Sequence, residues 1–471
     1  MTTLLVLALA QPTALDIVNA GLAAQGGRDR LAAIAKTATE CVAYEHMFEQ
    51  SERPEGPYLQ IIRDYTETAD FAAATVAVDG KMNGAVVQGW MPRKFTLDFR
   101  NNKLVPATEA SDMRRRLAIG PERVLLAAAS APDLRAEKPT KLHGVLQDVV
   151  KFSWGKVPVT VLLNPVTHLL TAVETTQVGE YYWAPWGDVA YRTVYGNWSI
   201  EQGGVRFPLQ WSLQRNGMVQ GDVTVTKVTF TKGAPTEPKA LLAETAPKQE
   251  VAPVKLAAPK TIAPGVVLFP GGFQCAVVDQ GDGLVVIESV VGSEYTAAIL
   301  KEVAKQFPGR PVKAVVSTSD AWPHMGGLRT FVAEGIPVYI HHLTEPQARR
   351  MISAPHTVVP DALQLKPRAA NLRKVDKPVD IGTGPNRLRV VPIRGSTTER
   401  MMVVYFPEKK LLYASDTLQA MGGKFFQVHM VSELVACVKR EGFDAQSAWA
   451  MHSGVIPWDR VTKAVTEAEG K

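Results

Sequence analysis

The hydrophobic pattern of this chain changes its period once, and the change divides the chain into two differently folded parts. From about residue 40 to 232 apolar and polar residues alternate, as in VRFPLQWSLQR (205–215). A period of two buries one face of each strand and leaves the other in water. The N-terminal part is therefore expected to be a curved antiparallel sheet, with a bulge near Lys227, where the alternation slips.

After residue 262 the pattern is mixed, with apolar runs of strand length between segments of helical period. Apolar residues four apart predict a helix over Ser293–Phe307, and residues 11 to about 30 are helical with a break at QGG. The stretch between the two patterns has no aromatic residue and no clean period, as is typical of a linker. We therefore expect an α+β two-domain chain: sheet domain 11–234, linker 235–262 and layered α/β domain 263–471.

Composition and charge exclude some classes of partner. The 471 residues include 52 Lys and Arg and 46 Asp and Glu, a net charge of +6 that is spread along the chain. The longest basic run is Arg114–Arg116, so we expect no nucleic-acid partner. No apolar stretch approaches the ~18 residues of a transmembrane helix. Cys41, Cys275 and Cys437 are too widely spaced for a disulfide framework or a zinc knuckle, and each is expected to be buried.

The first ten residues have features of an export signal. Leu4–Ala10 is apolar, and Ala8-Leu9-Ala10 fits the small-x-small pattern that precedes a cleavage site. Segment 1–10 therefore indicates an exported or periplasmic protein. No Lys or Arg precedes the apolar run, so a buried N-terminal strand or helix start in a cytoplasmic protein stays open as the alternative.

Three loops that follow apolar strands carry the side chains suited to metal chemistry. The turn VVSTSDAWPHMGGL (315–328) contains Asp320 and His324, LLYASDTLQ (411–419) contains Asp416, and WAMHSG (449–454) contains His452. Functional groups in layered α/β domains lie on such strand-end loops. Two imidazoles and a carboxylate can hold one zinc or iron ion with a position left for water, and Asp320 can supply a fourth oxygen.

The order of these landmarks resembles that of the metallo-β-lactamase fold, an αββα sandwich of metal-dependent hydrolases. The matching pieces are GVVLFPGGFQCAVVDQGDGLVVIES (265–289), a helix, the turn before Gly326-Gly327-Leu328, RGST (394–397), LLYASD and MHSG. The family's turn reads T-H-x-H-x-D-H-x-G-G. Here Ser319 and Ala321 replace both leading histidines, and Pro323 replaces the aspartate.

The resemblance implies that one of the family's two metal positions is lost and the other is kept. The third histidine of the first position falls on Ser396, so all its ligands are missing. The second position keeps His324, Asp416 and His452, which implies at most one divalent ion, zinc, and a hydrolase-like enzyme. Glu288 stands where the family has an aspartate that supports the metal loops.

Other interpretations of the same residues remain open. Asp320 can cap a helix that begins near Pro323, and His324 can be a half-buried helix histidine. The domain can also be a catalytically silent pseudoenzyme that binds a ligand or partner without metal. Ser319 or Ser396 as a nucleophile lacks support, because there is no G-x-S-x-G motif. The remaining histidines of interest, 341, 342, 356 and 429, are expected to be surface or core residues, and Trp322 packs in the core or lines the site.

The N-terminal part resembles, on fewer residues, the curved-sheet carriers of lipids and lipoproteins. The matching pieces are AAQGGRDRLAAIA (23–35) and YGNWSIEQGGVRFPLQWSLQRNG (195–217). This resemblance implies a concave face that holds apolar ligands. The expected substrate of the whole chain is therefore a small or apolar molecule, which the sequence does not identify further.

Overall fold

The chain folds into two compact units, and the second unit includes two short segments from the N-terminal half of the chain. The structure, a computed structural model, describes residues 12–48, 55–84, 91–98, 108–179, 181–236, 254–421, 424–425 and 427–470. The first unit comprises Met1–Met47, Leu59–Gln177 and Val189–Glu250, and the second comprises Phe48–Tyr58, Val178–Asp188 and Val251–Lys471. Two short segments from within the predicted sheet domain thus belong to the second unit.

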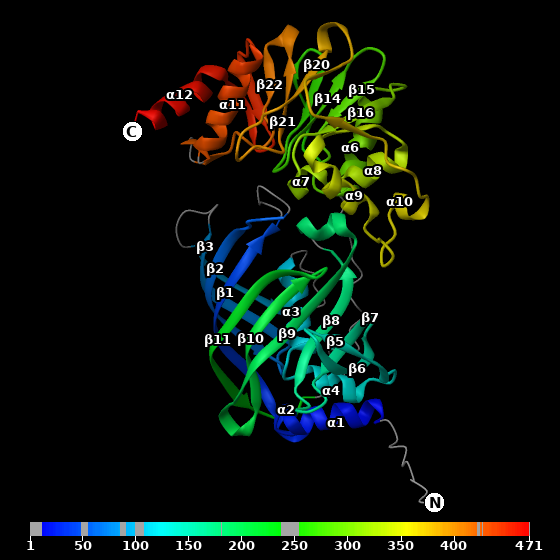
Figure 1. Ribbon diagram of the computed structural model, residues 1–471, viewed down its shortest axis with the longest axis vertical. Coiled ribbons are helices and arrows are strands. Elements are labelled where there is room, and N and C mark those ends of the chain that lie inside the picture. The colour runs from blue at the N-terminus through cyan, green and yellow to red at the C-terminus, as the bar shows by residue number, and fades with distance from the viewer. Residues whose placement is uncertain are drawn as a thin grey trace, which may run out of the picture. The chain divides into compact units, whose positions relative to one another are not determined.

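An eleven-stranded sheet forms the first unit, in the order β4-β3-β2-β1-β11-β10-β9-β8-β7-β6-β5 (Figure 1). Its strands are β1 Ile34–Met47, β2 Leu59–Asp70, β3 Thr75–Gly84, β4 Met91–Asp98, β5 Arg135–Leu142, β6 Val145–Trp154, β7 Val157–Leu163, β8 Leu170–Val178, β9 Asp188–Ile200, β10 Arg206–Arg215 and β11 Met218–Lys232. The predicted bulge is confirmed, because the β1–β11 register shifts between Glu40↔Lys227 and Cys41↔Val225.

Helices pack on this sheet and complete the first core. They are α1 Ala14–Ala24, α2 Arg28–Ala32, α3 Thr108–Ile119 and α4 Val124–Ser130. The helix break predicted at QGG lies between α1 and α2, where Gly26 and Gly27 adopt φ values of 116° and 100°. A capping box joins Thr13 and Asp16 at the start of α1.

The second unit contains two larger sheets. The seven-stranded sheet, in chain order, contains β12 Lys260–Ala263, β13 Val266–Phe269, β14 Cys275–Asp279, β15 Leu284–Ile287, β16 Val312–Ser317, β17 Val338–His341 and β18 Leu372–Val375. The six-stranded sheet has the order β19 Val379–Ile381, β20 Leu388–Pro392, β21 Met402–Phe406, β22 Leu411–Tyr413, β25 Ser447–Ala450 and β26 Ser453–Pro457. A short hairpin pairs β23 Ala420–Met421 with β24 Lys424–Phe425.

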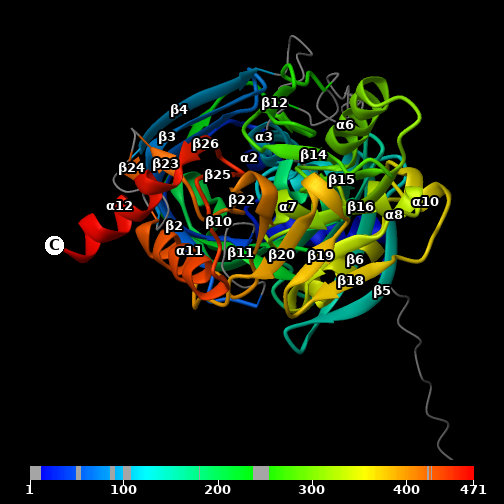
Figure 2. The same cartoon turned by 90° about the horizontal axis from the view of Figure 1, so that it is seen from above.

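The two larger sheets face each other, and helices cover their outer faces, which gives the four layers of an αββα sandwich (Figure 2). One buried cluster contains apolar residues of both sheets, such as Val285 and Val404, and another joins the six-stranded sheet to its helices. The helices are α6 Ser293–Gln306, α7 Trp322–Met325, α8 Leu328–Glu334, α9 Glu345–Ser353, α10 Ala362–Leu365, α11 Val428–Glu441 and α12 Trp458–Glu469. The predicted α+β architecture, a curved antiparallel sheet followed by an αββα sandwich, is confirmed.

Several narrower predictions can also be compared with the structure. The helix predicted over Ser293–Phe307 is α6, and all three cysteines are buried and unpaired. Among the described residues, no helix is long and apolar enough to cross a membrane. The signal segment predicted over 1–10 and most of the linker predicted over 235–262 lie outside the described residues.

Candidate functional site

The turn after β16 positions His324 at the end of the seven-stranded sheet. Its short helix α7 begins with Trp322-Pro323 and has Ala321 at the N-cap without a side-chain cap. The prediction that Asp320 caps this helix is therefore wrong. A Cβ at Gly326 would clash with the backbone of Val291, which explains why this turn ends in glycine.

His324 is enclosed between two carboxylates from other loops. Its side chain is 1% exposed, with Nδ1 3.1 Å from Glu288 Oε2 and Nε2 3.7 Å from Asp416 Oδ2. Burial alone would lower the pKa of His324, but the charges of Glu288 and Asp416 outweigh it and raise the pKa to about 10. The two carboxylates thus favour the protonated form of the imidazole.

Asp416 connects His324 to the third predicted residue, His452. Asp416 Oδ1 lies 3.3 Å from His452 Nε2, and His452 Nδ1 lies 2.7 Å from the carbonyl oxygen of Gly272. Burial would raise the pKa of Asp416, but its contacts with both histidines keep it well below the usual value. His452 is the more accessible histidine, because 31% of its side chain is exposed.

The loops that carry these residues contain strained backbone and buried polar support. Glu288 (φ 80°) and Ser415 (φ 51°) are non-glycine residues in the left-handed region, which costs about 1–3 kcal/mol each. The hydroxyl of Thr318 contacts Glu288 and lies 2.8 Å from Ser415 Oγ. Both strained residues are thereby fixed beside the histidine–carboxylate cluster, where Glu288 contacts His324.

Asp320 lies on the same turn and faces an arginine. Its Oδ2 is 3.5 Å from Arg400 Nη1, and Arg400 also contacts Glu55 (2.8 Å) and Glu399 (3.4 Å). Burial raises the pKa of Asp320 to about 7, against the opposing effect of Arg400. Arg400 could not be predicted as the partner of Asp320, since TTER carries no recognisable motif.

The residues at the lost first metal position have other partners. Ser319 Oγ accepts a hydrogen bond from the N–H of Ala321 (3.2 Å). The loop of Ser396 instead surrounds Glu433, whose carboxylate accepts bonds from the N–H and hydroxyl groups of Ser396, Thr397 and Thr398. Sequence reasoning missed Glu433, because it lies in the middle of the amphipathic helix α11.

We expect Glu433→Gln to lower the free energy of unfolding at pH 7 by about 1–3 kcal/mol, because an amide replaces one charged acceptor. Burial would raise the pKa of Glu433, but the hydrogen bonds from Thr398, Ser396 and Thr397 outweigh it and lower the pKa. A lowered folded-state pKa adds stability above the unfolded pKa of about 4.3, and this stability is lost as the pH falls further. Urea unfolding at pH 7 and at pH 4 should therefore show the difference from wild type shrinking at pH 4.

Exposed Glu467 provides the control for Glu433→Gln. It lies 3.8 Å from Lys463 and 65% of its side chain is exposed, so Glu467→Gln should change stability by less than about 0.5 kcal/mol. Equal losses in both variants would contradict the role assigned to Glu433.

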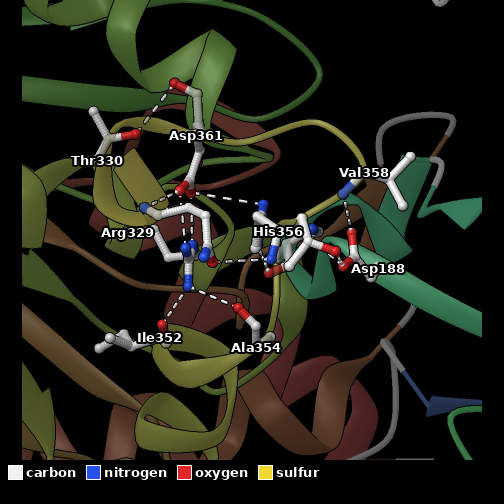
Figure 3. Close-up of polar contacts among 12 residues, drawn as sticks. Asp188, Arg329, Thr330, Ile352, Ala354, His356, Val358 and Asp361 are labelled. Atoms are coloured by element: carbon white, nitrogen blue, oxygen red, sulfur yellow. Dashed lines mark hydrogen bonds and ion pairs between the residues drawn. The ribbon is translucent and has the colours of Figure 1, made fainter. Parts of the chain in front are cut away.

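A separate polar cluster, drawn in Figure 3, explains the burial of His356. Arg329, 3% exposed, contacts both carboxylate oxygens of Asp361 at 2.6 and 2.8 Å. His356 Nε2 lies 3.3 Å from the carbonyl oxygen of Pro185, and the backbone after His356 donates to Asp188. The cluster attaches segment Val178–Asp188 within the second unit, so His356 has a structural role.

The remaining histidines and Trp322 lie at surface or core positions, as expected. His341 is buried, whereas His342 and His429 are exposed. Trp322 is 3% exposed and packs against Trp183, Trp186 and Phe48, with ring centroids 4.7, 5.2 and 6.4 Å away. It is therefore a core residue of the second unit.

The polar atoms of these residues, and the hydrogen bonds they lack, indicate whether the residues suit a metal ion. In the described part of the chain, no group of three or more His, Cys, Asp or Glu side chains is arranged to hold a metal ion. Yet several buried atoms of the cluster lack a well-aligned hydrogen bond: His324 Nδ1 and Nε2, Asp416 Oδ1, Asp320 Oδ2 and Glu288 Oε2. Buried polar atoms that have ion-pair neighbours but no well-aligned hydrogen bond are suited to bind a further group. The donor set fits a metal chemically, provided that Asp416 releases its imidazole partners.

Comparisons with known proteins agree with the sequence landmarks. Residues 270–440 match the family model described as the metallo-beta-lactamase superfamily, which confirms the predicted resemblance. Similar solved structures include a metallo-beta-lactamase from Pontibacter korlensis (17% identity, 46% of this chain and 100% of that chain, TM-score 0.36). Another is a stereoselective inverting sec-alkylsulfatase from Pseudomonas sp. (17%, 45% and 40%, TM-score 0.34). A third is the metallo-beta-lactamase FIM-1 from Pseudomonas aeruginosa in its mono-zinc form (18%, 46% and 96%, TM-score 0.35).

Proposed function

We propose that the second unit is a hydrolase-like enzyme that holds one divalent metal ion, zinc, in the position of His324, Asp416 and His452. Asp320 is the proposed source of a fourth oxygen. The observation that carries the proposal is the group of buried nitrogen and oxygen atoms without well-aligned partners on His324, Asp416 and Asp320. The match of residues 270–440 to the metallo-beta-lactamase superfamily supports the class of chemistry.

The orientation of the two histidines also favours ligation. Each places Nδ1 beside an oxygen acceptor, Glu288 for His324 and the carbonyl of Gly272 for His452. Each then directs Nε2 toward Asp416. Metal-ligating histidines are commonly held in this way, with one nitrogen fixed by an oxygen and the other on the metal.

Chemistry at such a site would divide between the ion and the chain. A bound divalent ion supplies Lewis-acid polarisation of a substrate oxygen. Glu288 and the carbonyl oxygen of Gly272 would hold the two imidazoles in orientation through Nδ1, and the partly exposed position of His452 leaves the site open to a small or apolar substrate that enters from solvent. Because Ser319, Ala321 and Ser396 replace the first-position histidines, the proposal includes one ion and no bridged pair.

Metal analysis of the full-length protein, purified without chelators, tests the proposal. We expect close to one equivalent of zinc in the wild type. His324→Ala and Asp416→Ala should each reduce it below about a tenth of an equivalent, because each removes a ligand of a site that has few. His429→Ala is the matched control, since His429 is exposed.

Three outcomes would contradict the metal proposal. They are wild-type protein with less than about a tenth of an equivalent after incubation with zinc, retention of zinc in both ligand variants, and loss of zinc in His429→Ala. Circular dichroism of each variant separates loss of the ligand from loss of the fold.

A second candidate function is a non-catalytic, metal-free binding site. It is favoured by the close pairing of His324 with Glu288 and Asp416, which can neutralise the buried carboxylates without an ion. Under this candidate, wild-type protein stays free of zinc, and added zinc leaves its melting temperature unchanged. Under the metal proposal, zinc raises that temperature by stabilising the folded state.

Export of the protein is part of the same proposal. It depends on Leu4–Ala10 and the small residues Ala8 and Ala10.

A further inference from the structure

The first unit contains a cavity that the proposed enzyme function does not use. Its volume is about 260 Å³. Residues of β1–β3, the end of α3 and β8–β11 line it, all within the first unit. Because an engineered apolar cavity of ~150 Å³ already holds benzene, this cavity has room for a molecule of one or two rings.

The buried part of the wall is apolar and aromatic. Trp211 is the cross-strand partner of both Tyr195 and Val223, so these three lining side chains form one row across β9, β10 and β11. Each is less than a tenth exposed, as is Val173, which lines the same cavity from β8. The rings of Tyr195 and Trp211 meet edge-on, with centroids 6.2 Å apart. A ring that enters the cavity therefore meets aromatic side chains on which it can stack.

The cations of the wall already have other interactions. Three arginines each lie within 3.0 Å of a carboxylate: Arg63 with Glu45, Arg116 with Glu67 and Arg192 with Glu174. The guanidinium carbons of Arg115 and Arg215 lie 4.0 and 5.2 Å from the centroid of the Tyr191 ring. The sixth cation, Lys81, is exposed and is therefore hydrated. An acid group on a ligand would have to compete with these partners, and would lose its own hydration in doing so.

Uncharged polar groups also line the cavity. Burial raises the pKa of Tyr65 and of Tyr195 above the usual value, so that both phenols stay neutral. Thr175 is 2% exposed, and its hydroxyl oxygen accepts a hydrogen bond from Gln177 Nε2 at 3.1 Å. A hydroxyl that accepts one bond can donate another, so Thr175 can bind a polar atom of a ligand that carries no charge.

We propose that this cavity binds a compact, uncharged compound of one or two rings, packed against Trp211 and Tyr195, with one polar group near Thr175. A charged ligand is disfavoured because the cations of the wall are engaged elsewhere. A flexible chain is disfavoured because it loses more rotamer freedom on binding than a rigid ring and gains no stacking on the aromatic wall. The ligand class is thus a phenol, alcohol or ketone built on a ring.

Fluorescence of the uncharged probe N-phenyl-1-naphthylamine tests this proposal with full-length protein. Titration should show saturable binding, which 2-naphthol should displace at concentrations at least about tenfold lower than 2-naphthoate, since the two share the same rings and only 2-naphthoate is charged. The uncharged chain 1-octanol, of similar hydrophobicity, should require higher concentrations than 2-naphthol. Equal or stronger displacement by 2-naphthoate would overturn the uncharged class, and equal or stronger displacement by 1-octanol would overturn the preference for a ring. Absence of saturable probe binding would overturn the site itself.

The strand β10 offers a matched pair of variants that fill space, because Leu209 and Leu213 lie on the same face and both pack, partly buried, against the core of the first unit. Leu213 lines the cavity and Leu209 does not, and the two positions are about 13 Å apart along the strand. Leu213→Trp should weaken binding of 2-naphthol about tenfold or more, and Leu209→Trp should leave it unchanged. Equal effects of both variants would overturn the proposal. If Leu213→Trp lowers the melting temperature, Val78→Trp on β3 serves instead, and unchanged binding in it would also count against the site.

Discussion

Replacing Arg116 with leucine is expected to lower the free energy of unfolding of the first unit by about 3–5 kcal/mol. Arg116 lies between Glu67 and Glu122, with Nη1 and Nη2 at 2.8 and 2.7 Å from the two oxygens of Glu122. The side chain of Glu122 is completely buried, so the variant leaves a carboxylate without its cation in a medium that solvates charge poorly. Denaturant unfolding of the variant and the wild type measures this loss.

Two companion variants determine whether the loss comes from the unpaired charge. Arg116→Leu combined with Glu122→Leu should recover most of the stability, because apolar replacement of a buried ion pair is often neutral. Arg135→Leu removes an exposed pair, 3.3 Å from Glu137, and should cost less than about 1 kcal/mol. A double variant as unstable as Arg116→Leu would show that packing, rather than charge, dominates the effect.

Replacing Trp322 with alanine should cost about 3–5 kcal/mol in the second unit. The side chain packs edge-on against Trp183 and Trp186, and such aromatic pairs add about 0.5–1.5 kcal/mol beyond the buried area. Trp322 also stacks on Phe48, so this one residue contacts both N-terminal segments of the second unit, Phe48–Tyr58 and Val178–Asp188. Denaturant unfolding gives the energy, and near-UV circular dichroism should lose the signal of closely packed tryptophans.

Trp458 is the control for this substitution. It is only partly buried against the core of the six-stranded sheet and its helices, so Trp458→Ala should cost no more than about 2 kcal/mol. If Trp322→Ala destabilised the protein no more than Trp458→Ala, the aromatic cluster would not be what holds the segments in place.

Much of the fold could be predicted from residue patterns, because local period and core position agree. The alternation along 205–215 predicts a strand there, and the structure has β10, with Phe207 and Trp211 buried. The slip at Lys227 predicts a bulge for the same reason. Segments Phe48–Tyr58 and Val178–Asp188 were not predicted to leave the sheet domain, since the aromatic contacts that assign them to the second unit involve residues far apart in sequence.

The candidate site was predictable where strand ends determine position. His324, Asp416 and His452 follow three different strands, and the structure brings all three together. Asp320 as a helix cap was wrong, because a turn that begins with Trp322-Pro323 leaves the cap to Ala321. Arg400 and Glu433 were missed for a common reason: each acts through a long-range charge contact that no local pattern reports.

The two N-terminal segments that belong to the second unit limit where the chain can be cut into separately folding fragments, in evolution or in the laboratory. A cut within 235–262 separates the chain at a point with no regular hydrophobic pattern, yet it leaves Phe48–Tyr58 and Val178–Asp188 with the wrong fragment. The C-terminal fragment would then expose Trp322 where Trp183 and Phe48 had covered it. Exposed aromatic surface of this kind promotes aggregation. The C-terminal half is therefore not a transferable module, and any recombination that moves it must also move two short pieces encoded far upstream.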